Sequence, residues 1–130
     1  MLPPRILIVS GTRDTGVWLS QMLAQDGEQV EAVTDGALAF QRVWDVDYDV
    51  IVSELGMPGI DGRDLYMAFQ NTWPELTRRM VFVCARPTED QEIFVARTGV
   101  PLLRDPVRVV EFRDAVRRVR AHPRSRVLAS

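Results

Sequence analysis

The sequence of 130 residues contains no lysine, one cysteine (Cys84) and one histidine (His122). A single cysteine excludes a disulfide within the chain and makes a cysteine-based zinc site implausible. His122 stands alone near the end of the chain and is not a credible phosphodonor or metal site. No apolar run approaches the roughly 18 residues of a membrane span, and residues 1–4 lack the features of a signal peptide. We therefore expect a cytoplasmic protein that makes no membrane contact.

Length and composition indicate one ordinary domain. A chain that is 46% hydrophobic and 26% charged can bury a single core and remain soluble. We expect this domain to span residues 1–122, with residues 123–130 as a tail or the start of a linker.

Charge is distributed unevenly along the chain. Residues 1–96 contain 15 acidic residues against 7 arginines, whereas residues 97–130 contain 3 against 9. Clustered arginines can neutralise nucleic-acid phosphates, so a basic nucleic-acid-binding module is one alternative. The sequence shows no nucleic-acid motif or stacking platform, so a solvated helix face with a tail is preferred. The run comprises Arg113, Arg117, Arg118, Arg120, Arg124 and Arg126.

Five apolar segments alternate with five segments of helical apolar spacing. The strands are expected at residues 5–9, 29–33, 50–53, 80–84 and 101–103. The first helix is expected to be capped by Asp14 and ended by Gly27, and the others to cover residues 37–44, 63–73, 88–97 and 107–120. This alternation predicts a three-layer α/β domain with a parallel sheet.

The stretch DVIVSELGMPGIDG, residues 49–62, is the most informative. Its apolar, β-branched start is typical of a strand buried on both faces, and Glu54 stands where that strand should end. Gly56, Pro58, Gly59 and Gly62 then predict a loop. Ligands and chemistry collect at the carboxyl ends of parallel strands, so a site is expected at Glu54.

This stretch resembles the phosphorylation segment of response-regulator receiver domains in two-component signalling. In that family a strand ends in the acceptor aspartate and a Met-Pro-Gly-x-Asp-Gly loop follows, as residues 57–62 do here. The resemblance runs from about residue 5 to residue 120 and implies a flavodoxin-like fold with strand order 2-1-3-4-5. The segments WPEL (residues 73–76) and TGVP (residues 98–101) are also similar to receivers of hybrid histidine kinases.

The resemblance assigns each part of the family's site to a position in this chain. Glu54 takes the acceptor's place. Leu102 falls at the position of an aromatic residue that turns inward when the site is phosphorylated. The two acids that help to hold magnesium correspond to Ser10 and Gly11. The hydroxyl residue corresponds to Cys84, and the lysine corresponds to Asp105.

These substitutions predict loss of the family's chemistry. Magnesium prefers oxygen ligands with one or two carboxylates, so Glu54 alone would make a poor site; Asp14 is better explained as a helix cap. Cys84 is expected to serve packing rather than reactivity. In the family, the lysine pairs with the phosphoryl group, and a pair of unit charges at 4 Å and a dielectric of 20 interacts by about 4 kcal/mol. Asp105 at this position turns that attraction into a repulsion. Arg104 is expected to point away from Glu54.

Glu54 itself has two interpretations. It is either a solvated acid that has lost its role, which we prefer, or a partial imitation of an acyl phosphate with a longer reach. One charge and two oxygens would then replace a dianion with three oxygens.

In the family, partners and dimers use the face formed by helix four, strand five and helix five. Here that face is expected to combine acids with arginines, which would allow self-complementary contacts in a homodimer. The residues concerned are Glu89, Asp90, Glu92, Arg97, Arg113 and Arg117.

We therefore predict a degenerate receiver-like domain that is not an enzyme, carries no cofactor and acts through protein contacts. A histidine kinase or another signalling domain is the expected kind of partner. The alternatives are an unusual active receiver phosphorylated at Glu54 by a histidine kinase, and the nucleic-acid-binding module.

Overall fold

The computed structural model describes residues 5–104 and 106–120. Its five strands are β1 (Ile6–Val9), β2 (Val30–Val33), β3 (Val50–Glu54), β4 (Met80–Cys84) and β5 (Leu102–Arg104). The helices are α1 (Arg13–Ala24), α2 (Gly36–Asp45), α3 (Gly62–Thr72), the 3-10 helix η1 (Pro74–Arg79), α4 (Glu89–Thr98) and α5 (Val109–Arg120). No α-helix within these residues is long and apolar enough to cross a bilayer.

The strands form one parallel sheet in the order β2-β1-β3-β4-β5. This order and the alternation of strands with helices confirm the expected doubly wound fold. The central strands β1 and β3 are buried on both faces, as their apolar sequences predict. Their register pairs Val9 with Ser53, so the residues that follow, Ser10 and Glu54, lie at the same edge of the sheet.

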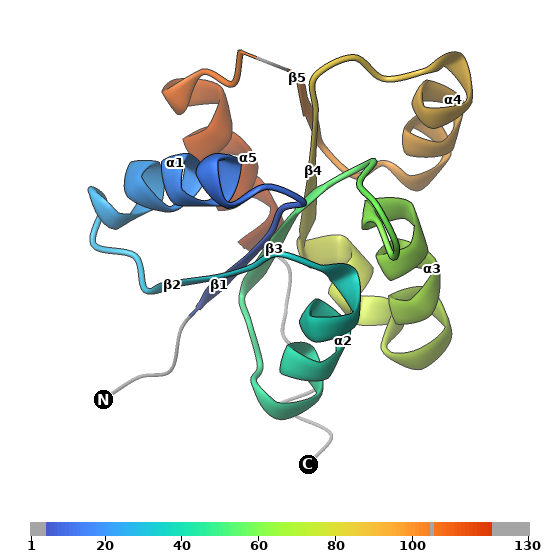
Figure 1. Cartoon of the computed structure of the whole chain (residues 1–130), viewed down its shortest axis with the longest axis horizontal. Helices are drawn as coiled ribbons and strands as arrows, with labels where there is room; N and C mark the ends of the chain where they lie inside the picture. Colours follow the sequence, from blue (N-terminus) through green and yellow to red (C-terminus); the bar gives the residue numbers. More distant parts are fainter. Residues whose placement is uncertain (1–4, 105, 121–130) are drawn as a thin grey trace.

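Helices cover both faces of the sheet (Figure 1). On one face, α1 and α5 enclose a core that includes Ile8, Leu19 and Val116. On the other face, the core under α2, α3 and α4 includes Phe69 and Val95. The two cores hold the sheet rigidly enough to fix the residues at its carboxyl edge.

Two local predictions about helix starts differ from the structure. Asp14 is not the cap of α1, because the N-cap position is Thr12 and Asp14 lies in the first helical turn. Helix α5 starts at Val109 rather than at Val107, whose side chain is buried in the core just before the helix. Apolar periodicity does not separate a buried residue that precedes a helix from one inside it.

Two other helix starts agree with their sequence signals. Asp61 caps α3, and its carboxylate and that of Asp64 each accept a backbone N–H from the other residue. Thr88 caps α4 through the equivalent pair of bonds with Gln91. These caps fix where the loops after β3 and β4 turn back over the sheet.

Candidate functional site at the carboxyl edge of the sheet

Ser10 and Glu54 meet where β1 and β3 end. The Ser10 side chain is buried, and its hydroxyl donates to Glu54 Oε1 and to the Thr12 carbonyl oxygen, which is 2.8 Å away. The Thr12 N–H in turn donates to Ser10 Oγ at 3.3 Å. A hydroxyl has one proton, so the two acceptors share it. The hydrogen-bonding capacity of Ser10 is therefore used inside the protein.

Gly11 is packed closely against the loop that follows β3. A Cβ atom at this position would lie 2.9 Å from Met57 Cβ and 3.5 Å from Pro58 Cδ. The nearest atom is the Met57 Cβ, which is bonded to the backbone. Unlike the end of a flexible side chain, it cannot move aside by rotation. A larger residue at position 11 therefore requires this loop to move.

Gly62 allows the first turn of α3 to lie against the end of β3. A Cβ atom there would lie 2.4 Å from the Glu54 carbonyl oxygen. Only glycine fits such an approach, which explains why α3 begins with glycine. This contact fixes the backbone of Glu54.

The Cys84 thiol lies at the end of β4 and contacts α4. Its sulfur is 3.8 Å from Gln91 Oε1, the same oxygen that caps the Thr88 N–H at 2.9 Å. Burial raises the pKa of the thiol above its usual range; the Glu54 charge acts in the same direction, and Arg104 opposes it. At neutral pH the sulfur therefore remains a protonated thiol, which is a weak donor.

Arg104 and Leu102 lie on the strand beside Cys84. The Arg104 guanidinium pairs with the Glu92 carboxylate of α4 at 2.5 Å, so it points to α4 rather than to Glu54, as expected. Leu102 is half-buried against the core beneath α4. Asp105, expected at the lysine position, lies outside the described residues.

The α5 arginines expected on the partner face lie elsewhere. Arg113 pairs with Asp26, just beyond α1, at 2.7 Å, and Arg117 lines the same groove between α1 and α5. Their placement on the face with α4 and β5 was wrong, because the helical phase turns them toward α1. In contrast, Glu92 does lie toward β5, through its pair with Arg104.

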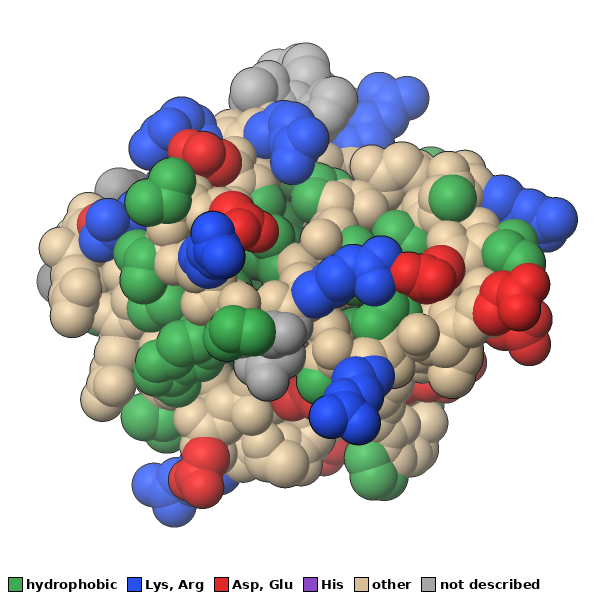
Figure 2. Space-filling model, turned by 90° about the horizontal axis from the view of Figure 1, so that it is seen from above, with side chains coloured by type: hydrophobic (Ala, Val, Ile, Leu, Met, Phe, Trp, Pro, Cys, Tyr) green, Lys and Arg blue, Asp and Glu red, His purple; other side chains and the backbone are tan. Residues whose placement is uncertain are grey.

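Charges of both signs alternate over the end of the molecule that carries this edge. Figure 2 shows arginine side chains spread among acidic and apolar ones, with no single basic patch. On α5, Arg120 binds Glu28 through two hydrogen bonds of 2.6 and 2.9 Å, and Arg117 pairs with Asp114 at 3.2 Å. Much of the basic charge of α5 is thus matched within the protein.

Two residues outside the predicted site, Thr12 and Gln91, help to hold this edge together. Thr12 accepts the Ser10 proton through its backbone, for which no side-chain pattern gives a signal. Gln91 links the α4 cap to Cys84. The spacing Thr88-x-x-Gln91 is a capping-box signature that could have been found in the sequence.

The comparison with protein families decides the identity of this fold. The family model of the response regulator receiver domain matches residues 6–103. The chain belongs to this family. It is thus a receiver domain of two-component signalling, a family whose members are generally signalling modules rather than classical enzymes.

Curated relatives of this receiver domain are longer proteins. It is 38% identical over 58 residues to the transcriptional regulatory protein TcrA of Mycobacterium tuberculosis, a match that covers 45% of this chain and 23% of TcrA. It is 33% identical over 61 residues to the transcriptional regulatory protein TctD of Salmonella typhimurium, which covers 47% of this chain and 27% of TctD. The matched part spans about a quarter of each relative.

Solved structures share the fold at low identity. The receiver domain of a histidine kinase from Syntrophus aciditrophicus has a TM-score of 0.80 and 22% identity, covering 92% of this chain and 91% of that one. The receiver domain of NtrX from Brucella abortus has a TM-score of 0.81 and 17% identity, covering 91% and 99%. These similarities support the architecture.

Proposed function

We propose that this receiver domain does not accept a phosphoryl group and signals through protein–protein contact in a single conformation. The observation that carries the proposal is the hydrogen bond from Ser10 to Glu54. The carboxylate at the acceptor position is thereby bonded to a neutral residue, Ser10, which directly follows β1. Active members of the family carry acids at that place. A histidine kinase or another signalling domain is the proposed class of partner.

The oxygen donors at this edge do not fit magnesium. Ser10 is already engaged by Thr12 and Glu54, and Gly11 offers no side chain. Glu54 is then the one carboxylate among these three positions, whereas magnesium sites normally combine carboxylates with several waters in octahedral geometry. An aspartate at position 11 would also press against Met57. We infer that magnesium binding is lost or weak.

The same contacts favour a structural role for Glu54 over imitation of a phosphorylated state. A phosphoryl mimic should engage the residue at the end of β4, but the Cys84 thiol is directed to Gln91. Glu54 instead ties β3 to β1. The domain would therefore present the same surface with or without a phosphodonor, and its partner would recognise that surface directly.

A phosphorylation experiment tests this proposal. The protein is mixed with magnesium and beryllofluoride, and amide chemical shifts are compared before and after; a second sample receives acetyl phosphate and is weighed by mass spectrometry. We expect no shifts beyond those of a Glu54→Gln control and no phosphoryl adduct. Shifts centred on Glu54 and Cys84, or an adduct lost in the control, would instead establish the alternative of an unusual active receiver.

The nucleic-acid alternative gains no support from α5. Arg113, Arg117 and Arg120 each pair with a carboxylate of the protein. Binding to phosphates would have to break these pairs, which weakens the electrostatic attraction on which such binding depends. His122, Arg124 and Arg126 lie outside the described residues. Self-association through α4 and β5 stays a prediction that sedimentation can test.

A further inference from the structure

A groove runs between α3 and α4, away from the Ser10–Glu54 edge. It has a volume of about 430 Å³ and is lined by Arg63 of α3 and by Asp90, Ile93, Phe94 and Arg97 of α4. In Figure 1 these two helices flank the sheet on the same side. The groove is formed by side chains of two helices, so it offers no free strand edge to an incoming chain.

The floor of the groove is apolar and held in place from below. The Phe94 ring packs edge-on against Tyr66, with ring centroids 5.5 Å apart, and lies 6.1 Å from the Phe82 ring of β4. These contacts between rings restrict the orientation of Phe94. A bound group would therefore meet a preformed surface, which reduces the entropy lost on binding.

Two apolar side chains of α3 and α4 are only about half covered by the rest of the protein. Ile93 is 44% exposed and Met67 is 50% exposed. Met67 lies one turn beyond Arg63 on the same face of α3. Within α4, Val95 is buried and Phe94 is half-buried against the core, whereas Ile93 stays largely open to solvent. Such an exposed group of apolar residues on a defined groove is typical of a contact surface.

Arginine exceeds carboxylate among the side chains that line the groove. The Arg63 guanidinium lies over the Phe94 ring, 4.9 Å from its centroid. Among the described residues, neither Arg63 nor Arg97 forms an ion pair, whereas Arg42, Arg113 and Arg120 each do. Asp90 supplies one carboxylate against two arginines. The rim therefore attracts an acidic partner.

We propose that this groove docks an acidic, amphipathic helix of a partner protein. Its apolar side chains would cover Ile93 and the part of the Phe94 ring that Arg63 leaves open, and its carboxylates would reach Arg63 and Arg97. A helix fits because it satisfies its own backbone hydrogen bonds, which the side-chain walls of the groove could not do. This inference rests on the proposed function, since it names the surface through which the domain would act without phosphorylation.

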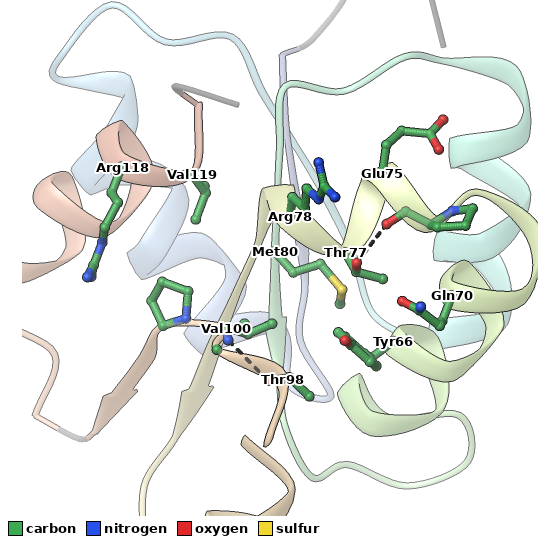
Figure 3. A pocket seen from close by; sticks show the side chains of 13 residues that line it. Tyr66, Gln70, Glu75, Thr77, Arg78, Met80, Thr98, Val100, Arg118 and Val119 are labelled. Carbon is green, nitrogen blue, oxygen red and sulfur yellow. Dashed lines mark hydrogen bonds between the residues drawn. The ribbon is translucent and has the colours of Figure 1, made fainter. Parts of the chain in front are cut away.

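A second hollow lies farther along the same two helices. Figure 3 shows Tyr66 and Gln70 of α3 facing Thr98, at the end of α4, across a pocket of about 600 Å³. From Arg63 to Gln70 the helix rises by about 10 Å. A docked helix of about 12 residues, or three turns, would span the groove and reach this pocket.

The test uses a designed peptide and the complete 130-residue chain, with no phosphodonor present. The probe has about 12 residues, leucines spaced to form one helical face and glutamates on the flanks. A control peptide replaces every glutamate by lysine. Binding is followed by amide chemical shifts of the labelled protein, and we expect shifts confined to α3, α4 and the pocket for the acidic peptide alone.

Matched variants separate the groove from general electrostatics. Arg63→Glu with Arg97→Glu should weaken binding about tenfold or more, because two attractions become repulsions. Arg13→Glu with Arg86→Glu changes the net charge equally at two exposed arginines outside the groove and should change binding less than about twofold. Ile93→Asn should also weaken binding, and circular dichroism verifies that each variant is folded.

The inference is overturned if the two double variants weaken binding equally, if the lysine peptide binds as well as the acidic one, or if the shifts lie on another face. It is likewise overturned if the acidic peptide does not bind at all. A phosphoryl adduct on Glu54 would refute the proposed function, whereas these peptide results would still decide whether the groove is a docking site. The phosphorylation experiment therefore tests the proposed function, and the peptide experiment tests the docking site separately.

Discussion

The Ser10 hydroxyl donates a hydrogen bond to the Glu54 carboxylate, and so joins the ends of β1 and β3. These residues are 44 positions apart in the sequence and meet because their strands are neighbours in the sheet. In an active receiver, acids and a metal occupy this region. Here a neutral hydroxyl and a carboxylate bind one another directly.

Removal of the Ser10 hydroxyl should destabilise the domain. We expect Ser10→Ala to lower the free energy of unfolding by about 1 to 2 kcal/mol, because Glu54 and the Thr12 carbonyl lose a buried donor. Thr15→Ala removes an exposed hydroxyl pair with Thr12 and should cost no more than about 0.5 kcal/mol. Urea denaturation measures both. Equal losses of unfolding free energy in the two variants would show that the Ser10 hydrogen bond stabilises the protein no more than an exposed one.

Replacement of Glu54 by aspartate alone should not restore phosphorylation. The positions of the acid pair and of the lysine would still be occupied by Ser10, Gly11 and Asp105. We expect activity to require at least Ser10→Asp, Gly11→Asp, Glu54→Asp and Asp105→Lys together, with acetyl phosphate as donor and mass spectrometry as the measurement. An acid-labile phosphoprotein formed by the single variant would contradict our account of the site.

The close approach of Gly11 to Met57 predicts a penalty for any side chain at position 11. Gly11→Ala should destabilise the protein by about 1 to 3 kcal/mol, because the loop after β3 must move to admit the methyl group. Gly16→Ala is the matched control, since its Cβ would meet neighbours at ordinary distances of 3.7 and 3.9 Å. Within helix α1 it should stabilise by up to about 1 kcal/mol. Thermal or urea unfolding compares the two.

The contact between position 11 and Met57 also affects any attempt to restore the acid pair. Gly11→Asp should activate the domain poorly unless the Met57 Cβ is removed as well, by Met57→Gly. If the Gly11→Ala protein is as stable as the natural one, the loop is more adaptable than this contact implies.

A group of polar side chains on β2 and α2 predicts how stability depends on pH. Glu31 accepts hydrogen bonds from Arg42, at 2.7 and 3.0 Å, and from the buried Tyr48 hydroxyl at 2.6 Å. Burial pushes the pKa of Glu31 up, but the bonds from Arg42 and Tyr48 outweigh it and hold the pKa below its ordinary value of 4.5. The folded state therefore favours the ionised form.

The direction of the pH effect follows from this lowered pKa. The contribution of Glu31 to stability is fully present above pH 4.5 and is lost as the pH falls through the lower pKa of the folded state. Glu31→Gln should remove this part of the acid sensitivity and cost about 1 to 3 kcal/mol at neutral pH. Unfolding free energies measured from pH 7 downward test it; an unchanged slope in the variant would show that Glu31 is not responsible.

Local sequence patterns were enough to predict the receiver family and the alternation of strands and helices. These features are local: apolar runs mark strands, helical spacing marks helices, and the loop from Met57 to Gly62 carries a motif of fixed spacing. The caps at Asp61 and Thr88 are local in the same sense, since each bonds to a backbone N–H only three residues away.

Which side chains meet depends on the tertiary packing of the elements. The bond from Ser10 to Glu54, the contact of Gly11 with Met57 and the pair of Arg113 with Asp26 all join residues that are distant in the sequence. Which neighbour a helix turns its arginines toward depends on its rotational phase against the sheet, which is set by the packing of its buried residues. The groove between α3 and α4 likewise exists only because two separate helices leave apolar residues uncovered side by side.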